Sequence, residues 1–207
     1  MPEYAFKILA FVLLLVYRVI RKVWEHRLSA HLKQEPVVVR KPLRERLVLG
    51  AMGVLMVPWF AWVIGPWLDF AHVPVPDWIR WGGGVITVLG IGYFASTHRA
   101  LAHNWSPLLE LREGNTLVTG GPYRLVRHPM YSAGFVVNIG SSILSANWLV
   151  AAGLVAGMLV VYAVRVGDEE RMMLDAYGEQ YREYMARTGR LAPRLSAVLG
   201  RERPDRA

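Results

Sequence analysis

Apolar residues fall along this chain in long blocks rather than in alternating or amphipathic patterns. The blocks are Tyr4 to Ile20, Leu47 to Leu68, Trp78 to about Thr97, and Met130 to Val166. A membrane-spanning helix needs about 20 apolar residues, so each of the first three blocks predicts one span. The fourth block is too long for a single span and requires a turn.

The turn is predicted at Ser145 to Trp148, where Ser-Ala-Asn-Trp interrupts the last apolar block. These turn-forming residues indicate a tight hairpin between two helices. The first of them, Met130 to Ser145, is short. The pattern therefore predicts an all-α integral membrane protein with about five transmembrane helices and a cytoplasmic amphipathic region at the C-terminal end.

Composition supports this class. Of 207 residues, 54% are hydrophobic and only 19% are charged, and the mean hydropathy is +0.26. A soluble domain of this size rarely has that balance. Cysteine is absent, which excludes disulfides, thiolate metal sites and cysteine nucleophiles.

Basic residues concentrate in three segments beside the predicted spans. Lysine and arginine number nine in Arg18 to Arg46, four in Thr97 to Met130, and nine from Arg165 to the C-terminus. Five crossings place all three segments on one side, which the positive-inside rule makes the cytoplasm. The N-terminus is then outside, and in a bacterium the membrane is the inner one. The net charge of +8 thus fits anionic lipid headgroups rather than nucleic acid.

Two other chemistries lack their signatures. The histidine pairs His26/His31 and His98/His103 are five residues apart, and there is no HExxH, so no metal site is predicted. No Gly-x-Ser-x-Gly supports a serine hydrolase.

Charged residues follow the last apolar block directly, in Arg165-Val-Gly-Asp-Glu-Glu170. Arg165 and Glu169 are four residues apart, so they project from one face if the helix continues. Charges beside a membrane span are costly unless they are paired or used, which makes them candidates for a functional site. A simple ion pair at a helix end is the alternative.

A further helix is predicted after this joint. One stripe of it carries Met173, Tyr177, Tyr181 and Tyr184, with charged residues opposite, and Gly178 should bend or break it. We interpret this helix as an amphipathic lid over the cytoplasmic mouth of the bundle.

The segment Gly121 to Tyr131, GPYRLVRHPMY, places arginines, a histidine and tyrosines at the start of an apolar block. Proline is favoured in the first turn of a helix, so the fourth helix should begin at His128 or Pro129. Free amide groups at such a start attract a carboxylate or phosphate. Tyr123 and Tyr131 could cover a flat ring or a sulfonium. An ordinary basic loop beside the membrane is the alternative.

The blocks NTLVTGGPYRLVRHPMY and DEERMMLDAYGEQYREYMARTGRLAP together resemble the C-terminal signature of isoprenylcysteine carboxyl methyltransferases and the related phospholipid N-methyltransferases. The resemblance covers about Asn104 to Pro193. It implies an integral membrane enzyme that transfers a methyl group from S-adenosyl-L-methionine to a lipid-like or isoprenyl-bearing acceptor at the cytoplasmic face.

The apolar blocks and the resemblance together divide the chain, and the resemblance implies which residues act. Residues 1–97 would form three spans with a basic cytoplasmic loop, residues 98–193 the cofactor-binding catalytic region with the hairpin 130–166, and residues 194–207 a basic tail. Arg165 and Glu169 are the expected catalytic residues, Glu169 also binding the cofactor and Arg165 the substrate. The other expected cofactor-binding residues are Glu110, Asn115, Thr116, Leu117, Val118, Tyr123, His128, Pro129, Met130 and Tyr131.

The chemistry is compatible with these residues. Methyl transfer from a sulfonium is an in-line displacement, so catalysis can rest largely on positioning and desolvation. A carboxylate acceptor is already ionised and needs no general base, which favours O-methylation, with Arg165 holding the carboxylate. The expected partners are a lipid or a prenylated small molecule or peptide, and membrane lipids, without metal or nucleic acid.

Two other functions are compatible with the same residues. Membrane sterol reductases have a similar arginine-histidine-proline-x-tyrosine element and acidic pair but bind NADPH, whose 2′-phosphate Arg124 and Arg127 could hold. The other is a non-catalytic membrane scaffold that retains the fold. Cofactor-dependent thermal stabilisation distinguishes these alternatives.

Overall fold

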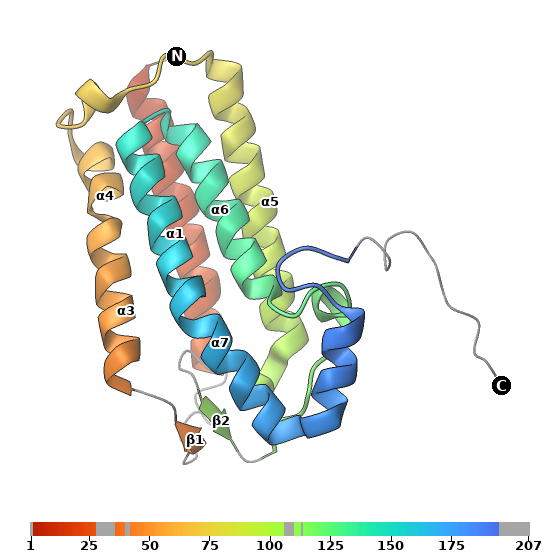
Figure 1. Cartoon of the computed structure of the whole chain (residues 1–207). Helices are drawn as coiled ribbons and strands as arrows, with labels where there is room; N and C mark the ends of the chain where they lie inside the picture. Colours follow the sequence, from red (N-terminus) through yellow and green to blue (C-terminus); the bar gives the residue numbers. More distant parts are fainter. Residues whose placement is uncertain (1, 28–35, 40–41, 106–109, 113, 195–207) are drawn as a thin grey trace.

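The computed structural model describes residues 2–27, 36–39, 42–105, 110–112 and 114–194. In this part of the chain the helices form a bundle, and two short strands pair beside one end of it (Figure 1). The elements are α1 (Glu3–Arg27), β1 (Pro36–Val39), α3 (Pro42–Leu55), α4 (Val57–Ile64), η1 (Asp69–Ala71), α5 (Asp77–Leu101), η2 (Ala102–Asn104), β2 (Glu110–Arg112), η3 (Gly121–Arg124), α6 (Pro129–Ser145) and α7 (Trp148–Arg187).

The predicted apolar blocks correspond to helices. The second block is divided between α3 and α4 at Met56, because Pro58 enters the first turn of α4 and supplies no amide hydrogen. The predicted hairpin is present: Ala146 has φ 47°, and the Asn147 side chain accepts hydrogen bonds from the amides of Leu149 and Val150. The all-α prediction holds for the bundle and misses the antiparallel β1–β2 pair, in which Val39 lies opposite Glu110.

The outer surface of the bundle is apolar. By length and composition, two segments within the described ranges could cross a membrane, Arg46–Ile64 and Trp148–Arg187. Large apolar side chains are also exposed on α1 and α5. Examples are Ile8, Phe11, Leu15, Val19, Val85 and Leu89. Extended exposed apolar surface of this kind is typical of contact with lipid.

The connections of the bundle lie at two ends (Figure 1). The N-terminus, the connection from α4 to α5 and the α6–α7 turn share one end, and the end of α5 and the start of α6 share the other. Hydrogen bonds fix the first end: Val73 N donates to Ala146 O at 2.7 Å, and Asn147 Nδ2 donates to Leu68 O at 2.7 Å. The basic residues near the end of α5 and near the start of α6 therefore lie at the opposite end of the bundle.

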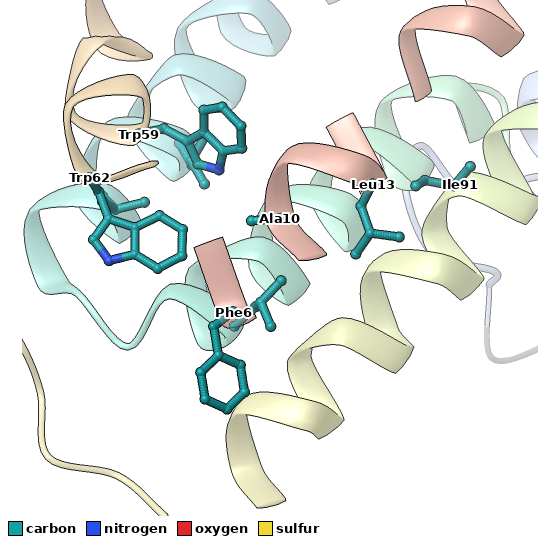
Figure 2. Packing of buried hydrophobic residues seen from close by; sticks show 9 residues of the cluster. Phe6, Ala10, Leu13, Trp59, Trp62 and Ile91 are labelled. Atoms are coloured by element: carbon teal, nitrogen blue, oxygen red, sulfur yellow. The ribbon is translucent and has the colours of Figure 1, made fainter. Parts of the chain in front are cut away.

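One face of helix α1 packs against the rest of the bundle. Figure 2 shows its Phe6 and Ala10 near Trp59 and Trp62 of α4. Leu144, Val150 and Leu154, from the α6–α7 hairpin, complete the cluster on this side. Inside a bilayer such contacts stabilise chiefly through close van der Waals packing, because lipid is as apolar as leucine.

Glycines let α5 and α6 approach closely. A Cβ atom on Gly83 would lie 2.5 Å from Leu144 N, and one on Gly140 would lie 2.6 Å from Thr87 N. Gly153 allows a similar approach of α7 to the carbonyl of Leu55 in α3. Small residues at helix contacts have this packing role in membranes.

The end of the bundle that holds the N-terminus contains an ion pair whose arginine is buried. Arg80 on α5 is 4% exposed, and its Nη1 atom lies 2.6 Å from Glu3 Oε2. Its Nε atom donates to Leu144 O at 3.0 Å, and its guanidinium carbon lies 3.8 Å from the centroid of the Phe6 ring. These contacts join α1, α5 and the α6–α7 turn.

Candidate active site

A cavity of about 240 Å³ lies at the other end of the bundle, between the segment 115–131, α7 and the end of α1. It brings together most of the residues that were predicted to form a site. Those on its wall are Asn115, Thr116, Leu117, Val118, Tyr123, His128, Met130, Tyr131, Arg165 and Glu169.

Among the predicted site residues whose side chains the structure describes, Pro129 does not line this cavity. Pro129 is buried in the first turn of α6, where it starts the helix rather than contacting a ligand. Glu110 lies on β2, and its side chain falls outside the described residues. Its expected role in binding the cofactor therefore stays a prediction.

Helix α6 begins at Pro129, as the sequence predicted, with His128 in the preceding position. The amide of His128 is not free for a ligand, however, because it donates to Arg190 O at 3.0 Å. The amide of Arg127 donates to Gly189 O at 2.8 Å in the same way. The chain that follows α7 therefore covers this part of the helix start, which sequence analysis did not foresee.

The bend predicted at Gly178 is present, with φ 52° and ψ −121° inside α7. The helix then continues at a new angle, and the predicted stripe of Met173, Tyr177, Tyr181 and Tyr184 lies on the cavity wall. The Tyr184 hydroxyl donates to Tyr123 O at 2.6 Å. This bond attaches the last part of α7 to the loop before α6.

Glu169 presents its carboxylate to the cavity. It accepts a hydrogen bond from the Tyr131 hydroxyl, its Oε2 atom lies 3.4 Å from His128 Nδ1, and its Oε1 atom lies 3.7 Å from Arg165 Nε. Burial alone would raise the pKa of Glu169, but the hydrogen bond with His128 and the charges of His128 and Arg165 outweigh it and lower the pKa. Glu169 is therefore ionised at neutral pH.

His128 has a carboxylate at each ring nitrogen. Nδ1 faces Glu169, and Nε2 lies 3.3 Å from Glu170 Oε1. Burial of the ring opposes its charge, yet hydrogen bonds with the two glutamates raise the pKa of His128 above the ordinary value. The imidazolium form can donate to both carboxylates, whereas a neutral ring could donate to one.

Glu170 joins three segments of the chain away from the cavity wall. Its carboxylate lies 3.1 Å from Arg127 Nε and 2.6 Å from Arg190 Nη2, besides the contact with His128. Burial would raise the pKa of Glu170, but these partners lower it to about 2. We refer to Glu170, Arg127, His128 and Arg190 as the Glu170 junction.

Five cavity-lining residues were not predicted from the sequence: Arg21, Leu101, Asn104, Trp105 and Met172. Asn104 has an evident role, because its Oδ1 atom accepts a hydrogen bond from Thr116 N at 2.7 Å and so positions the loop that lines the cavity. Asn115 Nδ2 donates to Asn104 O at 3.3 Å. Arg21 comes from a basic flank that the sequence explained by topology alone.

Comparison with known families identifies the part of the chain that forms this wall. A family model described as phospholipid methyltransferase matches residues 78–180, which include every predicted site residue. The chain belongs to the isoprenylcysteine carboxyl methyltransferase and phospholipid methyltransferase family. Helix α1 lies outside the matched family residues.

Curated relatives of this methyltransferase family member carry two kinds of name. The protein is 32% identical over 124 residues to the cobalt-zinc-cadmium resistance protein CzcN of Cupriavidus metallidurans, covering 58% of this chain and 57% of that protein. It is 29% identical over 144 residues to the human protein-S-isoprenylcysteine O-methyltransferase, covering 65% of this chain and 51% of that enzyme. The chain thus spans only about half the length of these relatives.

A solved structure shares the fold of this family member. It is the eukaryotic intramembrane Ras methyltransferase ICMT, with a TM-score of 0.53 and 24% identity, covering 76% of this chain and 54% of that one.

The name of the first relative mentions metals, but the described residues contain no group of three or more histidine, aspartate or glutamate side chains that could hold a metal ion.

Proposed function

We propose that the protein is an integral membrane methyltransferase that uses S-adenosyl-L-methionine and methylates an amphiphilic acceptor, with a carboxylate as the favoured acceptor group. The observation that carries this proposal is the gathering of Glu169, Arg165, Tyr131 and the loop 115–118 around one cavity. These residues come from separate segments, all within the family-matched part of the chain.

The wall of the cavity fits the methyl donor chemically. S-adenosylmethionine has an ammonium, a carboxylate and a flat base, and its sulfonium supplies the methyl group. Glu169, ionised and facing the cavity, would bind the ammonium or the ribose hydroxyls. The tyrosines and methionines of α7 would cover the base and exclude water, which strengthens electrostatic contacts in the site.

The state of His128 supports a carboxylate rather than an amine acceptor. An ammonium acceptor must lose a proton before its nitrogen can attack, and a histidine beside the cavity would be the natural group to take it. His128 is instead held between Glu169 and Glu170, whose carboxylates raise its pKa and favour the protonated ring, which has no free nitrogen to accept a proton. A carboxylate acceptor needs no such base, and Arg165 would orient it.

The arginines argue against the NADPH alternative. Arg127 is bound to Glu170 and donates to Thr188 O at 2.5 Å, so its guanidinium is already used inside the protein. Arg124 is exposed and does not belong to the cavity wall. Arg127 reaches the cavity wall but is engaged by protein partners, and Arg124 lies off the wall, so neither favours binding of a 2′-phosphate.

For the arrangement in the membrane we propose five crossings, with the N-terminus outside and the cavity at the cytoplasmic face. The grouping of basic segments supports this orientation. The apolar tail of the acceptor would reach the cavity from the bilayer, because the outward faces of the helices are apolar.

The test is binding of radiolabelled S-adenosylmethionine to the purified protein in detergent. We expect saturable binding that Glu169→Gln weakens at least about tenfold, as expected for loss of a charge-assisted hydrogen bond. Incubation with membrane lipids and labelled donor should then give a product that releases labelled methanol in alkali, as a methyl ester does. A protein that is stabilised by NADPH and does not bind S-adenosylmethionine would refute the proposal.

A further inference from the structure

Among the described residues, three arginines line the cavity: Arg21, Arg127 and Arg165. Arg127 is held in the Glu170 junction, and Arg165 lies four residues before Glu169 on α7. Arg21 differs in origin, because it lies on α1, outside the residues that the family model matches. The family signature therefore gives it no role.

The surroundings of Arg21 leave an excess of positive charge at this wall. Its Nε atom lies 3.0 Å from Glu25 Oε1, one helical turn further along α1. The same carboxylate also lies 3.3 Å from Lys22 Nζ, so Glu25 serves two cations. The three side chains together carry one net positive charge.

Aromatic side chains fix the position of Arg21. Its guanidinium carbon lies 5.9 Å from the centroid of the Trp105 ring, a distance at which cation–π attraction operates. Trp105 is itself buried and packs against the buried ring of His98, with the ring centroids 4.9 Å apart. The Arg21 side chain nevertheless remains 36% exposed, so a ligand in the cavity can reach it.

We propose that Arg21, backed by Trp105, forms an oxyanion-binding subsite on the α1 side of the cavity. The inference rests on the proposed function. The oxyanion belongs either to the carboxylate of the methyl donor or to an anionic group of the acceptor. A guanidinium binds both kinds of group through paired hydrogen bonds in a fixed planar geometry, which an ammonium cannot reproduce.

The location of this subsite has a consequence for selectivity. The other residues proposed to bind the donor lie within residues 78–180, which the family model matches, whereas Arg21 lies on α1. A change on α1 can therefore alter which molecules the cavity accepts without changing the shared signature.

The experiment compares Arg21→Gln with the wild type and with Lys22→Gln. Lys22 is a matched control, because it contacts the same Glu25 but is 79% exposed and does not line the cavity. Two ligands are titrated into the purified full chain: S-adenosylhomocysteine, and 5′-methylthioadenosine, which has the same adenosine thioether but no carboxylate or ammonium. Transfer to N-acetyl-S-farnesylcysteine is measured alongside.

If the oxyanion belongs to the donor, Arg21→Gln weakens S-adenosylhomocysteine binding by about tenfold to a hundredfold and leaves 5′-methylthioadenosine binding unchanged. If it belongs to the acceptor, both Kd values stay unchanged and the KM for N-acetyl-S-farnesylcysteine rises by a similar factor. Lys22→Gln should change none of these values.

The subsite is refuted if Arg21→Gln binds both ligands and transfers methyl groups with wild-type Kd and KM. That outcome leaves the proposed function intact, whereas a wild-type protein that does not bind S-adenosylhomocysteine refutes both. If Arg21→Gln fails to fold, Arg21→Met replaces it, since methionine keeps an apolar stem against Trp105.

Discussion

Glu169 and Glu170 are neighbours on α7, yet they belong to two different regions of the molecule. Glu169 is 21% exposed at the cavity wall, with partners that leave its carboxylate facing the open space. Glu170 is 7% exposed, and two arginines and a histidine from two other segments surround it. Successive residues of a helix point about 100° apart, which separates the two carboxylates.

The difference shows how a site can be held in shape without losing its reactive groups. The Glu170 junction joins the start of α6 to α7 and to the chain after it, and His128 belongs to both regions. The Glu170 junction holds these segments together, so the Glu169 carboxylate can face a ligand without being needed to stabilise the fold. This division of roles predicts separate effects of substitution on folding and on binding.

The largest expected effect is that of Glu170→Gln on stability. Removing one partner of a buried ion pair leaves the other charge uncompensated, and Arg127 is only 7% exposed. We expect a loss of about 3 kcal/mol in the free energy of unfolding, measured by denaturant titration in detergent, with activity lost in parallel. Glu179→Gln is the control, because this glutamate is 71% exposed and its ion pair with Arg182 should contribute less than about 1 kcal/mol.

Glu169→Gln should show the opposite pattern. We expect kcat/KM for methyl transfer to fall about a hundredfold, which corresponds to about 2.7 kcal/mol in transition-state binding. The melting temperature should change much less than in Glu170→Gln. Equal losses of stability in the two variants would remove the distinction between the two regions.

Arg80→Gln tests whether a buried arginine that is paired far from the cavity contributes to stability as the Glu170 junction does. Arg80 binds Glu3, Leu144 O and Ser145 O at the far end of the bundle. Loss of these charge-assisted hydrogen bonds should lower the free energy of unfolding by about 2 kcal/mol. The Kd for S-adenosylmethionine should stay at the wild-type value, because Arg80 does not line the cavity.

The stability that the Glu170 junction provides should fall at both low and high pH, giving an acidic and an alkaline limb in a plot of melting temperature against pH. The pKa of Glu170 falls from 4.5 to about 2 on folding, so its contribution is present above pH 4.5 and is lost as the pH falls toward 2. The pKa of His128 is raised from 6.5, so its contribution is present below pH 6.5 and is lost as the pH rises through the folded value. Melting temperatures across this range should show both limbs, and His128→Gln should remove the alkaline one.

Much of the fold was predictable because apolar blocks of spanning length determine where helices form. The helix start at Pro129 and the bend at Gly178 were also predictable, since each follows from the backbone limits of one residue type. The pair β1–β2 was missed, because strands as short as Pro36–Val39 and Glu110–Arg112 give no clear periodic signal.

The site was predictable only in part. The family signature placed Glu169 and Tyr131 in one group, and the structure brings both to the cavity. The signature did not reveal that Glu170 pairs with Arg190, because that contact depends on where the chain runs after α7. Arg21 and Trp105 were missed for a similar reason: they are 84 positions apart by number and meet only through packing of α1 against the end of α5.

The bend in α7 has a consequence for the shape of the cavity end of the protein. A straight helix of 40 residues would be about 60 Å long, twice the thickness of the hydrocarbon layer. With φ 52° at Gly178, the helix instead turns: its part before Gly178 runs along the bundle, and its part after Gly178 lies beside the cavity. Any residue with a Cβ atom would strain that corner. A single substitution of Gly178 would change the angle of the last part of α7 without replacing any residue that lines the cavity.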